Sequence, residues 1–349
     1  MKKGIKIAGI ILLAIVLIPV AYIVFLRIIM YDPEPVESAD FISGRETVST
    51  GDSLSVLTFN IGYAGYNKNE DFFMDGGKGV QPSSVDDVMK NISGISSIIS
   101  GEDCDIVFTQ EVDIDSRRSY HINEDSYIRT QTGYGRSFAC NYNVVFVPYP
   151  IPPIGKVYSG IATYTDLNVS EAQRISLPDA APWYIEMGYL KRCLLLNRIP
   201  LDDSDKELVL INLHMEAYTD EEKRDLQVNQ LRDLLAEEYE KGNYVIAGGD
   251  FNEEFSVNDN PPIISQTGWI PGEITLDDIP EGFRFAVADN IPSCRSLEKP
   301  FADYESSQTY IIDGFIVSDN ISVQNVEVRD YGFECSDHNP VKMNLTLLK

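Results

Sequence analysis

The sequence predicts a mixed α/β fold with more than one β-sheet. About ten strand-like apolar runs are interrupted by two amphipathic helices without strict alternation, which is too many strands for one ordinary sheet. A chain of 349 residues is long enough to enclose a large hydrophobic core. The strand-like runs cover residues 54–59, 106–109, 143–147, 161–164, 194–196, 208–213, 244–247, 311–317, 323–328 and 341–348.

The chain begins with a segment that predicts a single membrane-spanning helix. Residues 7–26 carry no charge, and twenty helical residues span about 30 Å of hydrocarbon. Three lysines precede the segment and only Arg27 follows it closely, so the positive-inside rule predicts a cytoplasmic N-terminus and an extracellular domain. A cleaved secretory signal is the alternative, but the segment is long for one and no small-x-small cleavage site follows it. We therefore expect residues 1–30 to anchor the protein in the cell membrane.

The remaining chain divides into a spacer and one folded domain. Residues 31–52 contain Asp32-Pro33-Glu34-Pro35 and little apolar periodicity, which predicts an extended spacer. Within the domain, residues 53–349, one helix is expected over 84–100 with Ser83 or Ser84 as its N-cap. A second helix is expected from Thr219, where Thr219 and Glu222 form a capping-box pattern, to a stop at Gly242.

The composition limits the kinds of partner. The formal net charge is −26, and all 54 acidic residues follow the apolar N-terminal segment. Non-specific binding of a nucleic acid relies on a basic face, so this composition disfavours it while leaving a local basic patch open. The five cysteines form no Cys-x-x-Cys pair, which gives a zinc ribbon no support and leaves open both disulfides and buried thiols.

Two polar units at strand ends carry the strongest functional signal. Gly249-Asp250-Phe251-Asn252 follows a strand-like run, and continuation of that strand would place Asp250 and Asn252 on one face. A carboxylate beside a carboxamide is suited to orienting water and contacting a phosphoryl oxygen. The second unit, Ser336-Asp337-His338-Asn339-Pro340, precedes the last run, and His214 ends another.

Three further residues stand at or inside strand-like runs. Asn60 ends the first run, and Glu111 ends the second, where a carboxylate offers a hard oxygen ligand for magnesium. Asp313 interrupts an otherwise apolar run, so it needs a partner, and His338 is an attractive one. Taken singly, the asparagines could be turn formers, Glu111 part of a solvated acidic loop and His214 a structural histidine.

Taken in order, these signals resemble the endonuclease/exonuclease/phosphatase family over residues 53–349. The resemblance implies a four-layer α/β sandwich, in which two packed mixed β-sheets are flanked by helices and the site lies at one end of the sheets. It further implies a magnesium site, with manganese or calcium as alternatives, held by Glu111 with Asn60 and Asp337 nearby. The ordered set is Asn60, Glu111, His214, Asp250, Asn252, Asp313, Asp337 and His338.

The resemblance also assigns roles on the substrate side. Asp250 corresponds to the residue that orients or deprotonates the attacking water, and Asn252 to a phosphate-oxygen contact. His338, oriented by Asp313, corresponds to the histidine that contacts the scissile phosphate or transfers a proton, and His214 to a second histidine on the phosphate side. The implied reaction is in-line attack of water on a phosphodiester or phosphomonoester.

The substrate itself stays open at this stage. A lipid headgroup, a small phosphoester and an extracellular nucleic acid are all candidates, and no feature identifies a protein partner. An extracellular DNA or RNA endonuclease is one alternative, and a non-catalytic surface binding protein with the same fold is another. Substrate contacts could also come from the aromatic segments 62–66 and 72–77 or from Arg117, Arg118, Tyr120 and His121, although packing is the simpler reading for these four.

Overall fold

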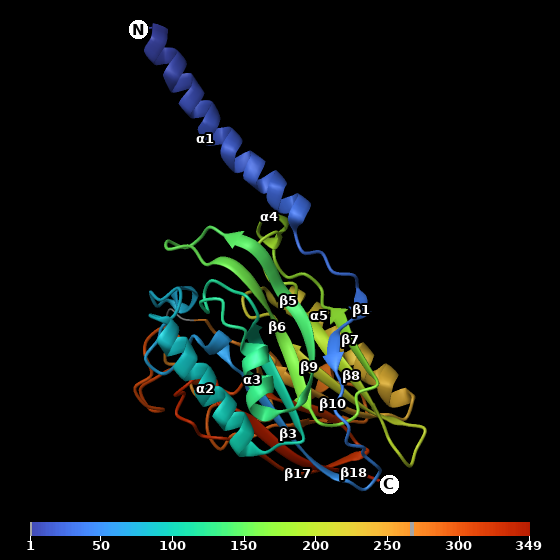
Figure 1. Cartoon of the computed structure of the whole chain (residues 1–349). Helices are drawn as coiled ribbons and strands as arrows, with labels where there is room; N and C mark the ends of the chain where they lie inside the picture. The colour runs from blue at the N-terminus through green and yellow to red at the C-terminus, as the bar shows by residue number, and fades with distance from the viewer. Residues whose placement is uncertain (1, 266–268) are drawn as a thin grey trace.

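Two seven-stranded mixed β-sheets form the centre of the molecule, and helices cover their outer faces (Figure 1). The computed structural model describes residues 2–265 and 269–349. The first sheet contains, in spatial order, β1 (Val36–Ser38), β7 (Glu171–Ser176), β8 (Cys193–Pro200), β9 (Glu207–His214), β10 (Tyr244–Asp250), β16 (Asp313–Ser318) and β13 (Phe283–Ala286).

The second sheet is of the same size and also mixes parallel and antiparallel pairs. It contains, in order, β17 (Ile321–Val328), β18 (Val341–Leu347), β3 (Ser53–Asn60), β4 (Ile106–Asp113), β6 (Gly155–Thr165), β5 (Gly135–Val147) and β2 (Asp40–Ile42). Two small two-stranded sheets are formed by β11 (Glu253–Phe255) with β12 (Gly272–Ile274) and by β14 (Cys294–Arg295) with β15 (Thr309–Tyr310).

The helices and the core clusters define four layers. The helices are α1 (Lys2–Ile29), α2 (Val85–Glu102), α3 (Glu124–Thr132), α4 (Trp183–Glu186) and α5 (Glu221–Glu240), with short 3-10 turns η1 (Gly62–Ala64), η2 (Phe73–Asp75) and η3 (Leu276–Asp278). One apolar cluster lies between the sheets and contains Phe108 and Leu210. A second joins α5 to the first sheet, and a third joins α2 to the second sheet. This arrangement confirms the predicted four-layer sandwich.

The positions of the two main helices follow from their sequences. In α2, Ser84 is the N-cap and accepts from the Asp87 backbone N–H, as predicted, and Ile92, Ile95 and Ile99 face the sheet. The second helix begins one residue later than predicted. Asp220, not Thr219, is its N-cap, because the Asp220 carboxylate accepts from the Lys223 backbone N–H.

The segment 31–52 is extended, as expected of a spacer, but it pairs with the domain. Its strands β1 and β2 add to an edge of each sheet, against β7 and β5 respectively. Val48 from the same segment is almost fully buried in the core between the sheets. The paired backbone and the buried valine tie this segment to the folded unit.

Helix α1 projects away from the sandwich (Figure 1). It is the one described helix that is long and apolar enough to cross a membrane, by length and composition, and most of its apolar side chains are exposed. All five cysteines are unpaired thiols. Of the two alternatives left open by the sequence, disulfides and buried thiols, the second describes Cys104, Cys193 and Cys294, which are buried.

Candidate active site

Three predicted site residues stand at one level of the first sheet because their strands are adjacent and in register. His214 ends β9, Asp250 ends β10, and the two are direct partners in the parallel ladder. Asp313 begins β16 and is the antiparallel partner of Asp250. Since neighbouring strands lie about 4.8 Å apart, the register alone brings these side chains to one end of the sheet.

The second sheet contributes Asn60 and Glu111 at the same end of the sandwich. Asn60 ends β3, and its partner on β4 is Gln110. Glu111 follows in a β-bulge, where the register of β4 against β6 shifts and the backbone φ is 56°. A bulge of this kind redirects one side chain out of the alternating pattern of the strand. The Glu111 side chain is thereby turned into the cavity that Asp250 also lines.

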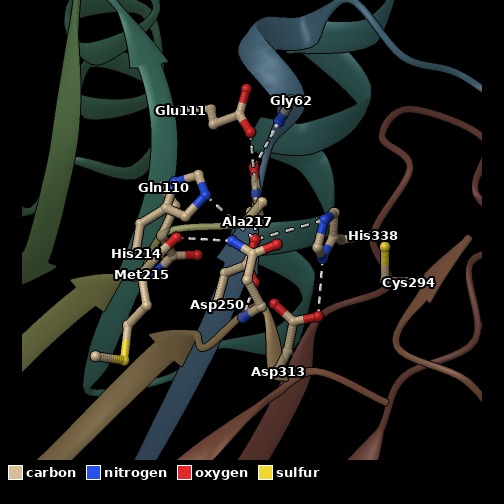
Figure 2. Close-up of polar contacts among 12 residues, drawn as sticks. Gly62, Gln110, Glu111, His214, Met215, Ala217, Asp250, Cys294, Asp313 and His338 are labelled. Atoms are coloured by element: carbon tan, nitrogen blue, oxygen red, sulfur yellow. Dashed lines mark hydrogen bonds and ion pairs between the residues drawn. The ribbon is translucent and has the colours of Figure 1, made fainter. Parts of the chain in front are cut away.

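Asp250 of the first sheet contacts Asn60 of the second sheet directly. Its Oδ2 accepts a 2.9 Å hydrogen bond from Asn60 Nδ2, and the same amide nitrogen lies 3.3 Å from Glu111 Oε1. His214 Nε2 and His338 Nε2 lie 3.5 Å and 3.7 Å from Asp250 Oδ2. Figure 2 shows Asp250 between the two histidines, with Glu111 beyond it. The structure thus unites residues that are up to 278 positions apart in sequence.

The backbone before Asp250 requires a glycine. Gly249 has a φ of 151°, and a Cβ atom there would lie 1.9 Å from the backbone oxygen of Leu213. Any larger residue would push β10 away from β9 and break the register that pairs Asp250 with His214. The glycine of the Gly-Asp-Phe-Asn unit is therefore a structural part of the site.

The predicted pair of His338 and Asp313 is present. His338 Nδ1 lies 2.8 Å from Asp313 Oδ2 (Figure 2). The same oxygen also accepts a 2.8 Å hydrogen bond from Ser293 Oγ. Burial lowers the pKa of His338, but the carboxylates of Asp313 and Asp250 outweigh it and raise that pKa well above the usual range. The surroundings of His338 therefore favour its protonated form, and its Nε2 lies 3.7 Å from Asp250 Oδ2.

Asp250 and His214 have opposite electrostatic settings. Burial raises the pKa of Asp250 to about 7 with a further contribution from the charge of Asp313, although His338 lowers it. Burial and then the positive charges of Arg192 and His338 lower the pKa of His214 well below its usual range. A carboxylate with an increased affinity for protons thus stands between a charged and a neutral histidine, which is a setting suited to proton transfer.

The predicted metal ligands meet at the second sheet. Glu111 and Asp337 line the same cavity, and Asn60 Oδ1 is oriented by the Gly62 backbone N–H at 3.0 Å. Burial and the charge of Glu111 raise the pKa of Asp337 to about 6, although His338 lowers it. Two repelling carboxylates beside an amide oxygen form a donor set that fits a hard divalent cation.

A second group of potential metal donors is nearby. One ligand atom each of Asp250, Asp313 and His338 lies within 4.8 Å of the others. Because His338 Nδ1 already bonds Asp313, this group is better described as a hydrogen-bonded His338–Asp313 pair with Asp250 at 3.7 Å from His338 Nε2. Asp250 in turn accepts the hydrogen bond from Asn60.

Asn252 lines the same cavity, but the amide nitrogen of its side chain is occupied by a hydrogen bond within the fold. Its backbone has a φ of 53°, its N–H donates to Asp250 Oδ1, and its Nδ2 donates to the Met215 carbonyl at 2.8 Å. The strand therefore does not continue through Asp250 to Asn252, contrary to the simple alternation argument. A turn brings the two residues together instead.

Arg192 is a site residue that the sequence analysis missed. It is 6% exposed and lines the cavity, and its nearest carboxylate is Glu216, at 3.6 Å from Nε. Its Nε and Nη1 have no hydrogen-bond partner among the described residues. Such spare guanidinium donors suit a phosphoryl oxygen. Lys191-Arg192 resembles any pair of basic residues before a strand, so the sequence contained no specific signal.

The loop after Glu111 contributes one cavity residue. Arg118 lines the cavity, forms two hydrogen bonds to Asp113 and lies 3.8 Å from the centre of the Tyr63 ring. Three neighbours have the packing roles expected of them, since Arg117 donates to the Pro153 carbonyl, Tyr120 donates to the Pro82 carbonyl and His121 pairs with Asp115 on the surface.

The cavity has a volume of about 590 Å³ and is lined by both polar and apolar side chains. The polar ones include Glu111 and Asp250, and the apolar ones include many aromatic rings. The segments 62–66 and 72–77 combine both roles considered for them. Their rings of Tyr63, Tyr66 and Phe72 pack edge to face, and the same side chains line the cavity.

Comparisons with known proteins agree with this architecture. The structure of an endonuclease/exonuclease/phosphatase from Beutenbergia cavernae is similar, with 18% identity, 85% of this chain and 72% of that chain covered, and a TM-score of 0.59. TDP2 from Caenorhabditis elegans follows with 15% identity, coverages of 85% and 75%, and a TM-score of 0.51. A mannosyl-6-phosphatase from Bacteroides thetaiotaomicron has 17% identity, coverages of 84% and 99%, and a TM-score of 0.50.

At these identities the structural likeness shows the fold alone. No curated protein matches the chain. A family model, by contrast, matches residues 57–338, which contain every one of the predicted site residues. The chain therefore belongs to the Endonuclease/Exonuclease/phosphatase family.

Proposed function

We propose that this protein is a divalent-metal-dependent phosphoesterase that hydrolyses a phosphodiester or phosphomonoester with an activated water. One observation carries the proposal. Asp250 contacts the predicted metal side through Asn60 and the predicted phosphate side through His338, within a single cavity. A water-activating group has to stand between these two sides for in-line attack.

The cavity residues have separate roles, which follow from their charges and positions. Asp250 accepts a proton from the attacking water, for which its raised pKa is suited. His338, held by Asp313, donates from Nε2 to a phosphoryl oxygen, and neutral His214 with Asn252 and Arg192 completes the contacts to the phosphoryl group.

Glu111, Asn60 and Asp337 would hold the cation, with magnesium as the first choice and manganese or calcium as alternatives. A bound divalent cation supplies charge neutralisation at the phosphoryl oxygens and the leaving group. The protein residues supply the water-side base, the orientation of the phosphoryl group and an enclosed site of low dielectric constant.

A nuclease is the less favoured alternative. The arginines that line the cavity, Arg118, Arg192 and Arg295, are enclosed within it and do not form an exposed basic groove. The formal charge of −26 also opposes long-range attraction of a polyanion. A non-catalytic binding protein would have no need of the buried group of Asp250, His338 and Asp313. Only the absence of turnover would favour a binding protein.

For location, we propose that α1 spans the cell membrane once, with a cytoplasmic N-terminus and an extracellular catalytic domain. The lysines before the apolar segment support this orientation. Accessibility of an N-terminal and a C-terminal epitope tag to protease on intact cells tests it, with only the C-terminal tag removed if the orientation is correct.

The proposed activity is tested by turnover of the purified full chain on a matched panel of phosphoesters with magnesium or with EDTA. The panel contains plasmid DNA, RNA, phospholipids and small phosphodiesters and phosphomonoesters. His338→Ala should lose at least about 100-fold in kcat, because it removes a charged contact to the phosphoryl group. His121→Ala is the matched control, since His121 is an exposed histidine paired with Asp115 outside the cavity. Equal losses in both variants, or wild-type rates in His338→Ala, would refute the assignment.

A further inference from the structure

The tip of the β5–β6 hairpin is an exposed apolar surface on an otherwise acidic protein. No charged residue stands between Arg136 and Lys156. Within this stretch Val145 is 49% exposed, Tyr149 69% and Ile151 92%. Apolar side chains clustered at this exposure mark a contact surface rather than a solvated loop.

The hairpin lies at the same end of the molecule as the active site. Strand β4 ends at Asp113, which pairs with Ser159 of β6, whereas β5 and β6 continue to pair as far as Val147 and Gly155. The hairpin tip, residues 148–154, therefore extends beyond the sheet end that carries Glu111.

The hairpin also contacts the apolar N-terminal helix. The Tyr22 hydroxyl of α1 donates to the Phe146 carbonyl at 2.8 Å, and Figure 1 shows the hairpin beside the C-terminal part of α1. Tyr22 lies four residues before Leu26, the end of the uncharged segment, which is about 6 Å of helical rise. If residues 7–26 span the hydrocarbon, the hairpin meets α1 at the boundary between acyl chains and headgroups, where tyrosine side chains are favoured.

The exposed surface continues into the catalytic cavity. Val147, Tyr149 and Ile154 from the hairpin line the cavity together with Ile185 of α4, which is itself 46% exposed. The same cavity is also lined by Glu111, Asp250 and His338. An amphiphile could thus place a phosphate group against these polar side chains and its apolar part along the hairpin side chains.

We propose that the β5–β6 hairpin tip and α4 rest in the interfacial layer of the bilayer that holds α1, so that the cavity receives its substrate, the phosphoester headgroup of a lipid, directly from that bilayer. The contact is apolar, because the acidic domain gains nothing by charge attraction to an anionic surface. The docking surface stands on the exposed residues and the α1 contact, whereas the choice of a lipid substrate rests on the proposed phosphoesterase function.

The docking surface is tested without any activity measurement. Full-length Ile151→Trp is reconstituted in phosphatidylcholine nanodiscs with or without bromine on the acyl chains, and the tryptophan quenching of the wild type is subtracted. Leu348→Trp is the control, because Leu348 is 45% exposed beside the C-terminus, at the end of the molecule away from α1 (Figure 1). We expect additional quenching for Ile151→Trp and none for Leu348→Trp. Equal quenching of the two, or none for Ile151→Trp, would overturn the proposed contact and leave the tip to a protein partner.

The proposed lipid substrate is tested by comparing hydrolysis of a phospholipid in a bilayer with hydrolysis of its water-soluble short-chain analogue. Ile151→Asp should lower the rate on long-chain phospholipid in the nanodisc at least fivefold and leave the rate on a water-soluble short-chain analogue unchanged, while Leu348→Asp should alter neither rate. Wild-type turnover of the soluble analogue without turnover of the bilayer lipid would overturn the lipid assignment alone. Turnover of neither lipid form, with hydrolysis of another phosphoester, would also overturn it. Absence of all phosphoester hydrolysis would refute the proposed function, and the quenching result would still decide the docking surface.

Discussion

At the scale of single residues, the site depends on how Asp250 is held. Asn60 donates to one of its oxygens and the Asn252 backbone to the other, while two histidines stand within 3.7 Å of Oδ2. These contacts fix the carboxylate, and burial raises its pKa. The same group is therefore both well oriented and more basic than an exposed aspartate.

Asp250→Asn should separate chemistry from stability. The substitution preserves the shape of the side chain but removes the proton acceptor, so kcat should fall by about 10²–10⁴-fold. The melting temperature should not fall by more than a few degrees, because an amide of the same shape removes the cost of burying a charge, which offsets the lost attraction to His338. Steady-state kinetics beside thermal unfolding measures both quantities. A large drop in melting temperature would mean that Asp250 acts mainly as a structural carboxylate.

Asp313→Asn should change the titration of His338. In wild type the pKa of His338 is raised above its unfolded value of about 6.5, so the stabilisation is fully present below that pH and is lost as the pH rises through the raised pKa. In metal-free protein the variant should therefore be less stable by about 2 kcal/mol at pH 6, and the difference should shrink at higher pH.

Two measurements check this prediction: urea unfolding of wild type and variant across pH, and the NMR titration of His338. A pKa of His338 that is unchanged in Asp313→Asn would contradict the proposed pairing, and a stability difference that grows with pH would reverse the expected sign. His121→Ala provides the assignment control for the exposed histidine resonance.

At the scale of elements, strand register does most of the positioning. His214, Asp250 and Asp313 meet because β9, β10 and β16 are adjacent, and the close approach of β10 to β9 depends on Gly249. The bulge in β4 turns Glu111 into the same cavity. The site is thus a consequence of sheet geometry rather than of any single loop.

Gly249→Ala should cost about 3 kcal/mol of folding stability and reduce activity, because its Cβ would overlap the Leu213 carbonyl. Gly101→Ala is the matched control. Gly101 lies in α2 with open space around its Cβ position, so alanine should stabilise the helix by about 0.5–1 kcal/mol. Urea unfolding measures the change in the free energy of unfolding for both variants. An unchanged free energy in Gly249→Ala would show that β9 and β10 can separate without loss of stability.

The elements also show how far sequence reasoning reaches. Apolar runs such as 208–213 and 244–247 predict β9 and β10 well, because both faces of these strands are buried. Strands β1 and β2 were not predicted, since edge strands of three residues lack an apolar pattern. Helix α3 was missed for a similar reason, as few of its side chains are apolar.

At the scale of the whole molecule, sequence order predicts the set of site residues but not their distances. The pairing of His338 with Asp313 could be inferred, because a charge inside a strand needs a partner. The contact of Asn60 with Asp250 across two sheets could not, because it depends on how the sheets pack. Arg192 escaped detection because only burial distinguishes it from other arginines.

The fold also unites the catalytic end with the apolar helix. Helix α1 and the β5–β6 hairpin lie toward one end of the sandwich, and the chain termini lie at opposite ends (Figure 1). Side chains of the hairpin also line the cavity. The β5–β6 hairpin is thus an uncharged, exposed stretch at the α1 end of a domain that is strongly acidic overall. Anchoring through α1 would therefore hold the domain at the end that carries the β5–β6 hairpin.

The central claim, metal-dependent phosphoester hydrolysis at the Asp250 cavity, is tested most directly by a magnesium titration of turnover with wild type and Glu111→Gln. The wild-type rate should rise from the EDTA baseline and saturate. Glu111→Gln should need at least about tenfold more magnesium, because it removes a charged oxygen ligand. Turnover that is insensitive to both EDTA and Glu111→Gln, or no turnover of any panel member by folded protein in saturating magnesium, would contradict the claim.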